Sequence, residues 1–420
     1  MWEAIASNRR RSWLLIGLMG SLLVALGALI GTALAPALAA YSDPYHRTEP
    51  DPYIGGLYGA GIALLLWFFL WGLARAGGDS LLLSSVGAQP IEKRHAPQLW
   101  NIVEEMTIAA GLRQMPKVYV IEDDMPNAFA VGHRADRATV AVTSGLLRRL
   151  NRDELQGVIA HEMGHIRNLD VRFLTLAGVM MGAIVLIADV FLRSLWYGGG
   201  GRRRSSSSRG GGQAQAILML VAVVLAILAP LLAQLLYFAC SRKREYLADA
   251  SGASFTRYPE GLASALEKIS RQVGGAQKVN RVVAPMYIVN PLQAGAAFSL
   301  FSTHPSTEKR VQILRSMAGA GLADYEAAYR KVHGGSARCL GARTLAAAES
   351  AAARAPSAAA ESKQDVVVRA RAVGDLVAGL ANFLLIPCDC GVRIKVPPKF
   401  TRPSVSCPRC GREHAVPTRG

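Results

Sequence analysis

Long apolar runs dominate the hydrophobic pattern of the chain and predict four membrane helices. The runs cover residues 13–35, 54–73, 173–188 and 216–239. A helix that crosses a bilayer needs about 20 mostly apolar residues. The third run is short because Asp189 and Arg193 follow it. The third and fourth runs are therefore expected either to cross the membrane or to form a hairpin that dips into it.

The charges beside these runs predict the orientation of the chain. Arg9, Arg10 and Arg11 precede the first run, whereas loop 41–53 carries three acidic residues and one arginine. Cytoplasmic loops are enriched in Lys and Arg, so the N-terminus and residues 75–172 are expected in the cytoplasm. The arginines of the Gly- and Ser-rich loop 198–215 break this pattern. The first run is longer than the apolar part of a signal peptide, which favours an uncleaved anchor.

A zinc-hydrolase motif, HEMGH, begins at His161 and ends at His165. Asn151 and Glu154 have the spacing of a capping box, and apolar residues follow at helical spacing, so the motif is expected on a helix. Side chains four residues apart share a helix face, which allows both imidazoles to bind one zinc ion. Glu162 then lies beside the metal and can take a proton from water. Two ordinary histidines on a charged helix are the alternative.

A third metal ligand is expected just after the fourth run. Glu245 and Asp249 are four residues apart and share a helix face. A carboxylate from Glu245 completes three protein ligands and leaves one position for water, and Asp249 suits a hydrogen bond to a ligand histidine. Two apolar runs separate His165 from Glu245, which returns the chain to the same side. Two solvated acids on a basic juxtamembrane helix are the alternative.

Four segments together resemble the HtpX family of membrane zinc proteases, which are bacterial relatives of the CaaX prenyl protease. These segments are residues 127–130, 161–165, 241–249 and 301–305, and the resemblance covers roughly residues 1–320. It implies an integral endopeptidase of the bacterial inner membrane, with its catalytic core in the cytoplasm, that helps clear misfolded or damaged membrane proteins. It also implies zinc on His161, His165 and Glu245, with Glu162 as the general base.

The same resemblance implies a strand beside the catalytic cleft, at Asn127, Ala128 and Phe129. Residues 117–121 and 139–143 are also rich in Val and Ile, which is typical of strands. An edge strand there can bind an extended peptide through its backbone, and a purely structural hairpin is the alternative. The resemblance further suggests His304 near the zinc, where it can stabilise an oxyanion. Otherwise His304 is a loop residue before the next helix.

A cysteine module near the C-terminus predicts a second, structural zinc site. Its ligands are expected to be Cys388, Cys390, Cys407 and Cys410. Two tight Cys-x-Cys-Gly and Cys-x-x-Cys-Gly turns aim two thiolates each at one metal, as in a zinc ribbon. Disulfides are disfavoured in the reducing cytoplasm. The ribbon is basic, which allows anionic lipid; its lack of interleaved aromatic residues argues against nucleic acid, and an adaptor role toward substrates or a partner protease is a further hypothesis.

Composition agrees with a membrane protein. The 420 residues are 51% hydrophobic and include 47 Lys or Arg against 30 Asp or Glu, which excludes a disordered chain and fits basic cytoplasmic loops. We expect a mainly α membrane protein with a zincin-type core, a small β-sheet and a zinc ribbon. The expected divisions are 1–74, two membrane helices; 75–172 and 240–333, the two halves of the core; 173–239, the third and fourth segments; 334–363, an Ala/Ser-rich linker; and 364–420, the ribbon.

The function expected from these features is a membrane-bound, zinc-dependent endopeptidase that holds one catalytic and one structural zinc ion. Its substrates are expected to be unfolded or membrane-tethered proteins. The alternative from another class is a catalytically idle membrane scaffold whose ribbon binds protein or nucleic acid. Replacement of Glu162 by Gln separates the two, because only the enzyme loses an activity while it keeps its zinc.

Overall fold

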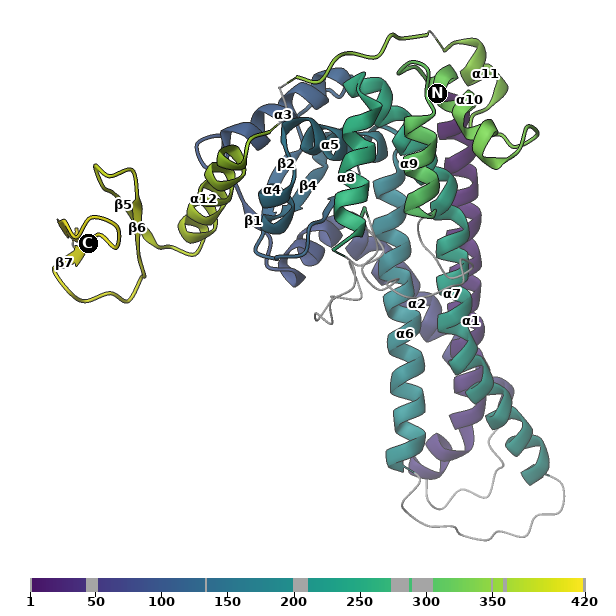
Figure 1. Cartoon of the computed structure of the whole chain (residues 1–420). Helices are drawn as coiled ribbons and strands as arrows, with labels where there is room; N and C mark the ends of the chain where they lie inside the picture. The colour runs from purple at the N-terminus through teal and green to yellow at the C-terminus, as the bar shows by residue number, and fades with distance from the viewer. Residues whose placement is uncertain are drawn as a thin grey trace.

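A computed structural model describes residues 2–42, 52–132, 134–198, 211–272, 287–288, 305–348, 350–357 and 361–417. Four long helices form a bundle, and the peptidase body sits at one end of it (Figure 1). The bundle helices are α1 (Trp2–Ser42), α2 (Pro52–Ser85), α6 (Asp170–Gly198) and α7 (Gly211–Thr256). The chain is thus mainly helical with small sheets, as its sequence predicts.

Each bundle helix contains one stretch that is long and apolar enough to cross a membrane. These stretches are Trp13–Ala35, Tyr53–Gly72, Leu176–Leu195 and Ala216–Leu235. Helices α6 and α7 run beside α1 and α2 along the bundle (Figure 1), and full crossing of the membrane by the third and fourth runs stays a prediction. Leu57, Ile62 and Leu65 of α2 are 73%, 66% and 71% exposed, which suits contact with lipid chains.

Glycines let α1 and α2 pack closely. Gly27 and Gly31 of α1 face Gly55 and Gly59 of α2, and a Cβ atom on Gly59 would lie 2.1 Å from the carbonyl oxygen of Gly27. Close backbone approach through small residues is the usual way in which membrane helices associate, because lipid provides no hydrophobic drive between them. This pair of helices is therefore fixed by shape.

The peptidase body is built on a four-stranded sheet in the order β1-β2-β4-β3. Its strands are β1 (Gln89–Pro90), β2 (Lys117–Ile121), β3 (Ala128–Val131) and β4 (Thr139–Thr143). Strands β2 and β4 are parallel, and the other pairs are antiparallel. Val120 and Val142 lie in the main core with α5 (Arg152–Arg167), whereas Ile121 and Ala141 on the other face pack with Leu83 of α2.

Further helices complete the body around α5 and α7. They are α3 (Pro97–Ala109), α4 (Ser144–Arg149), α8 (Pro259–Ser270), α9 (Thr307–Arg315) and α10 (Leu322–His333), with the 3-10 turn η1 (Ala135–Arg137) before β4. Helix α5 begins with the predicted capping box: Asn151 Oδ1 accepts from the amide of Glu154 at 2.9 Å, and Glu154 Oε2 accepts from the amide of Asn151 at 2.9 Å. The start of the catalytic helix is thus fixed by its own sequence.

The described residues of the Ala- and Ser-rich segment, 334–348, 350–357 and 361–363, contain the short helix α11 (Ala342–Ala346). Arg354 donates to Asp153 Oδ1 at 2.8 Å and to Gln156 Oε1 at 2.7 Å, both on α5. The amide of Ala320 donates to the carbonyl of Ala351 at 2.8 Å. Long-range hydrogen bonds therefore attach this segment to the body, which its low-complexity sequence does not predict.

The C-terminal module consists of a helix and a ribbon. Helix α12 (Lys363–Leu380) packs on α4, and Arg369 Nε donates to the carbonyl of Arg148 at 3.1 Å. Two hairpins follow it: β5 (Leu384–Pro387) with β6 (Arg393–Val396), and β7 (Ser404–Ser406) with β8 (Glu413–Ala415). The apolar stretch 376–386 thus contains the end of α12 and the start of β5.

Candidate metal centre and active site

The predicted metal ligands come together where α5 crosses α7. His161 Nε2 lies 3.2 Å from His165 Nε2, and the Glu245 carboxylate lies 3.6 Å from His161 Nε2 and 3.3 Å from His165 Nε2. All three side chains are buried. The two helices cross closely, since a Cβ atom added to Gly164 would lie only 3.1 Å from the carbonyl oxygen of Ala248. The glycine inside the motif thus admits the helix that brings Glu245.

These distances fit a tetrahedral zinc ion. Bonds of about 2.0–2.1 Å from zinc to nitrogen or oxygen place neighbouring ligand atoms about 3.3 Å apart in a tetrahedron. The Nδ1 atoms of His161 and His165 both face carboxylates, so their Nε2 atoms turn lone pairs toward each other and toward Glu245. Three acceptors at this spacing repel one another unless a cation lies between them. The donor set is therefore that of a metal centre.

Asp249 holds the first histidine in position, as its sequence spacing predicts. Its Oδ1 atom accepts from His161 Nδ1 at 2.9 Å. Arg310, on α9, binds both oxygens of Asp249 at 2.7 and 2.8 Å and approaches Glu245 at 3.4 Å. Burial opposes the charge on Asp249, but the attraction of Arg310 outweighs it and lowers the pKa of Asp249. Because both side chains are fully buried, this ion pair fixes the geometry behind the metal.

Asp170 holds the second histidine, and sequence reasoning missed it. Its Oδ2 atom accepts from His165 Nδ1 at 3.2 Å, and buried Arg244 lies 3.6 Å from its Oδ1 atom. Asp170 follows the motif by five residues and begins α6, at the edge of a predicted membrane run. An acidic residue at the start of an apolar run is a sequence signal that points to Asp170. Each ligand histidine therefore has its own carboxylate.

Glu162 is buried next to the ligands and contacts the edge strand. Its carboxylate accepts a hydrogen bond from the amide of Ala130, on β3. Burial raises the pKa of Glu162 above its ordinary value, which moves it toward the range of an effective general base. Glu162 is only 2% exposed, so water and the peptide have to reach a carboxylate that is almost closed off from solvent.

The residues predicted to bind substrate lie on or beside β3, which is an edge strand of the sheet. Asn127, Ala128 and Phe129 are all fully buried. The carbonyl of Ala128 accepts from the amide of Ile288 at 3.2 Å, so part of the outer edge already has a backbone partner. The predicted strand is confirmed, whereas peptide binding there stays a prediction. His304 lies outside the described residues.

The four C-terminal cysteines form the predicted second cluster. Cys388 Sγ lies 3.5 Å from the Sγ atoms of Cys390 and Cys410, and Cys390 Sγ lies 3.5 Å from that of Cys407. Zinc–sulfur bonds of about 2.3 Å give sulfur–sulfur distances near 3.8 Å in a tetrahedron, so the cluster fits zinc. The backbone amides of Cys410 and Arg409 lower the pKa of Cys407 to about 6, which favours the thiolate. With four protein ligands, this site leaves no position for water.

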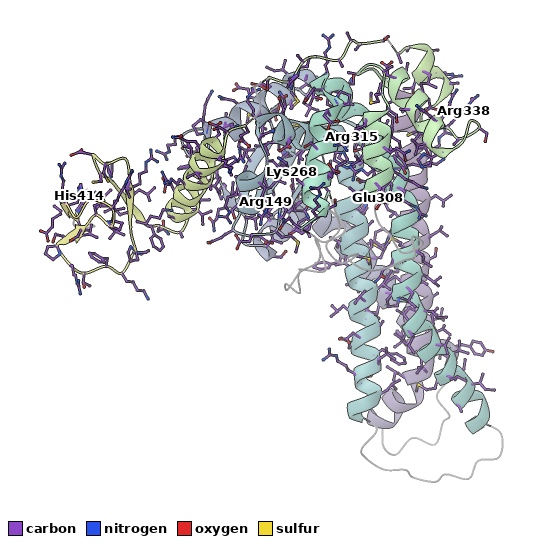
Figure 2. The ribbon with its side chains drawn as sticks, in the orientation of Figure 1. Arg149, Lys268, Glu308, Arg315, Arg338 and His414 are labelled. Atoms are coloured by element: carbon purple, nitrogen blue, oxygen red, sulfur yellow. The ribbon has the colours of Figure 1, made fainter. Side chains whose placement is uncertain are left out.

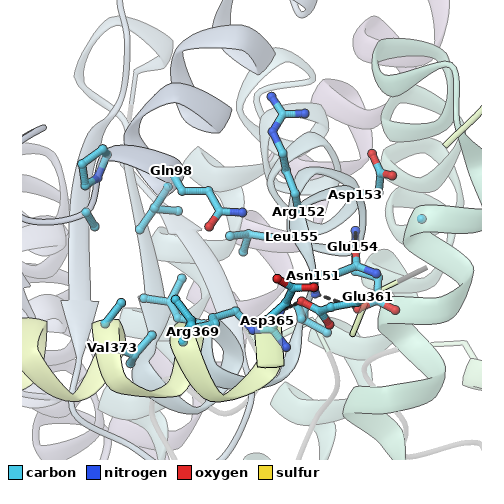
Figure 3. A pocket seen from close by; sticks show the side chains of 18 of the residues that line it. Gln98, Asn151, Arg152, Asp153, Glu154, Leu155, Glu361, Asp365, Arg369 and Val373 are labelled. Atoms are coloured by element: carbon cyan, nitrogen blue, oxygen red, sulfur yellow. Dashed lines mark hydrogen bonds and ion pairs between the residues drawn. The ribbon is translucent and has the colours of Figure 1, made fainter. Parts of the chain in front are cut away.

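A separate cavity of about 920 Å³ lies at the N-terminal end of α5. Figure 3 shows Asp365, Arg369 and Val373 of α12 facing Asn151 and Leu155 across it. Residues 151 and 161 are about 15 Å apart along a helix that rises 1.5 Å per residue. The cavity is therefore distinct from the metal centre and is bounded by the helix that carries the ribbon.

The bundle, the buried pair of carboxylate-bound histidines and the adjacent glutamate define a membrane metalloprotease with an HExxH motif. The model of peptidase family M48 matches residues 93–318. The chain is 44% identical to a protein named Protease HtpX homolog from Dictyoglomus thermophilum over 75% of this chain and 94% of that protein. It is 39% identical to one from Streptococcus gordonii over 76% of this chain and 100% of that protein. The chain belongs to peptidase family M48, and its relatives are the HtpX proteases.

A solved structure and the extent of the matches complete the comparison. The crystal structure of S. mikatae Ste24p has 16% identity and a TM-score of 0.38, and it covers 75% of this chain and 67% of that chain. The family model ends at residue 318, so α12 and the zinc ribbon lie beyond it. The resemblance predicted from the sequence motifs is confirmed by the family match and by the HtpX relatives.

Proposed function

We propose that this metalloprotease is a quality-control endopeptidase of the bacterial inner membrane that cuts unfolded or membrane-tethered chains on the cytoplasmic side. Its catalytic metal is zinc on His161, His165 and Glu245, and a second zinc ion on the four cysteines is structural. Beyond the metalloprotease class, this function specifies the side of the membrane on which cleavage occurs and the class of substrate.

The proposal is supported by the position of the metal site, which lies at the end of the membrane bundle. Helix α5 ends at Arg167 and α6 begins at Asp170, so the motif leads almost directly into a membrane helix. Glu245 lies on α7, ten residues beyond the span Ala216–Leu235. A peptide tethered to the bilayer therefore has a short path to this site. The peptidase body lies at the same end of the bundle as the N-terminus (Figure 1). The N-terminal side of the first span is rich in arginine, which favours the cytoplasm.

The residues of the site suit peptide-bond hydrolysis. Zinc, when bound, supplies a Lewis acid that lowers the pKa of water and polarises the peptide carbonyl. Glu162 accepts the proton of the attacking water at its carboxylate and transfers it to the nitrogen of the leaving amine. Asp249 and Asp170 hold the imidazole rings so that each Nε2 atom faces the position of the metal. The edge strand β3 lies beside Glu162 and suits an extended substrate where its outer edge is not already paired, since backbone pairing tolerates many sequences.

The proposal is tested with the full chain in inverted inner-membrane vesicles. A single-span reporter carries an unfolded tail on one side or the other, and cleavage is compared between the wild type and Glu162→Gln. We expect the wild type alone to cut the cytoplasmic tail, with equal zinc in both proteins. Cleavage confined to the opposite tail overturns the orientation. Equal cleavage by both proteins overturns the role of Glu162.

A further inference from the structure

Basic residues are concentrated in the zinc ribbon. Residues 384–417 contain six Lys or Arg against two Asp or Glu. Some of these charges have partners: Lys395 Nζ lies 3.3 Å from Asp375 of α12, and Arg412 pairs with Asp389. Lys399 and Arg402 are both exposed, and in the described part of the chain neither has an ion pair. They lie in the loop between β6 and β7.

This loop is held in one shape before it meets any partner. The amide of Phe400 donates to the carbonyl of Pro397 at 3.1 Å, and the amide of Val416 donates to the carbonyl of Pro403 at 2.8 Å. Phe400 lies between the two cations in sequence and packs half-buried against the ribbon core. The loop therefore presents Lys399 and Arg402 at little cost in conformational entropy.

The position of the loop points to its partner. The ribbon stands to one side of the peptidase body, and the loop between β6 and β7 forms its lower edge in Figure 1, toward the end where the membrane helices lie. A protein with four membrane helices keeps the ribbon permanently close to a bilayer. Each Lys or Arg near an anionic membrane surface contributes about 1 kcal/mol, which is a factor of about five. Exposed cations on a tethered module therefore fit acidic phospholipid head groups.

We propose that the loop between β6 and β7 docks on anionic lipid beside the bundle, through Lys399 and Arg402. The docked ribbon holds α12 at a fixed distance from the membrane, and α12 in turn contacts the body beside the N-terminal end of the catalytic helix. This inference is independent of the proposed substrate class, because it concerns lipid binding and not catalysis.

The test measures lysine reactivity in the full-length protein, reconstituted in nanodiscs of phosphatidylcholine alone or with added phosphatidylglycerol. Acetylation of Lys399 and of Lys331 is followed in the same sample by mass spectrometry. Lys331 is an exposed control on α10, at the other end of the molecule. We expect Lys399 to react about five times more slowly in anionic discs, with Lys331 much less affected, and raised salt to remove the difference.

Charge-reversal variants separate lipid from protein contacts. Arg402→Glu is expected to abolish the slowing at Lys399, whereas Arg338→Glu leaves it intact because Arg338 lies far from the ribbon (Figure 2). Protection of the ribbon cysteines from alkylation verifies that each variant is folded. Equal reactivity of Lys399 in both lipids overturns the proposal. The proposal is also overturned if Lys399 reacts more slowly than Lys331 to the same extent in both lipids and if this difference survives Arg402→Glu. That result indicates a protein partner.

Discussion

Replacement of Asp249 by Asn tests the architecture behind the metal. The carboxylate accepts from His161 Nδ1 at 2.9 Å and binds Arg310 at 2.7 and 2.8 Å. An Asn side chain has one acceptor oxygen and one donor nitrogen. If its oxygen keeps His161, its NH₂ group faces the Arg310 guanidinium, donor against donor. If the amide is flipped, its NH₂ group faces His161 Nδ1, and His161 loses its hydrogen-bond acceptor.

The magnitude follows from this geometry. Loss of a carboxylate behind a ligand histidine typically weakens metal binding by about 10- to 100-fold, which is about 1.4–2.7 kcal/mol. Asp249 is fully buried and its charge also balances Arg310, so neither orientation of Asn satisfies both neighbours. We therefore expect an effect near the upper end, about 100-fold in the zinc dissociation constant.

The assay is competition for zinc between the apoprotein in detergent and a chromophoric chelator of known affinity. All variants carry Cys407→Ser so that the ribbon does not contribute. Asp153→Asn is the matched control, because Asp153 is also a buried carboxylate bound to an arginine, Arg354, but lies at the far end of α5. An unchanged affinity in Asp249→Asn refutes the positioning role. Equal weakening in Asp153→Asn assigns the effect to general destabilisation.

Four further predictions concern stability and the ribbon. Arg310→Met leaves buried Asp249 without its counter-ion and is expected to lower the unfolding free energy by about 3–5 kcal/mol, and adding Asp249→Asn should recover part of the melting temperature; no recovery contradicts the coupling. Gly59→Leu forces α1 from α2 and should cost about 1–3 kcal/mol or more, whereas Gly61→Leu, where a new Cβ meets nothing within 4 Å, should leave detergent stability unchanged. Cys407→Ser should reduce bound zinc from two equivalents to one without loss of peptidase activity. In the wild type, the low pKa of Cys407 keeps its thiolate available to the metal, so the ribbon zinc should stay bound down to about pH 6 and be lost only at more acidic pH; loss of zinc well above pH 6, measured by metal analysis, argues against a low thiol pKa.

Local signals predicted most of the site. The capping box at Asn151, the spacing of His161 and His165, and the carboxylates at Glu245 and Asp249 each depend on residues within one helical turn or two. Helix periodicity fixes which of these side chains share a face. The even number of apolar runs between the two halves then required the halves to meet on one side. Such constraints are readable because each acts over a short stretch or over whole helices.

The missed residues depend on contacts between distant segments. Arg244 is fully buried beside Asp170, although an arginine that follows a membrane run is usually solvated. Arg354 lies in a low-complexity segment and yet binds Asp153, some 200 positions earlier in the chain. Neither contact leaves a periodic trace in the sequence, because periodicity reports which face of an element is apolar and not which element covers it.

The metal centre and the membrane bundle share the same helices. Asp170, which orients His165, is the first residue of α6, and Glu245 lies on the helix that forms the fourth span. A continuous helix transmits any shift or rotation along its axis to every side chain on it. The ligand spacing therefore depends on how α6 and α7 pack below the site, against α1 and against each other. The bundle is thus the scaffold that sets the distance between the histidines and the glutamate, in addition to its role as an anchor.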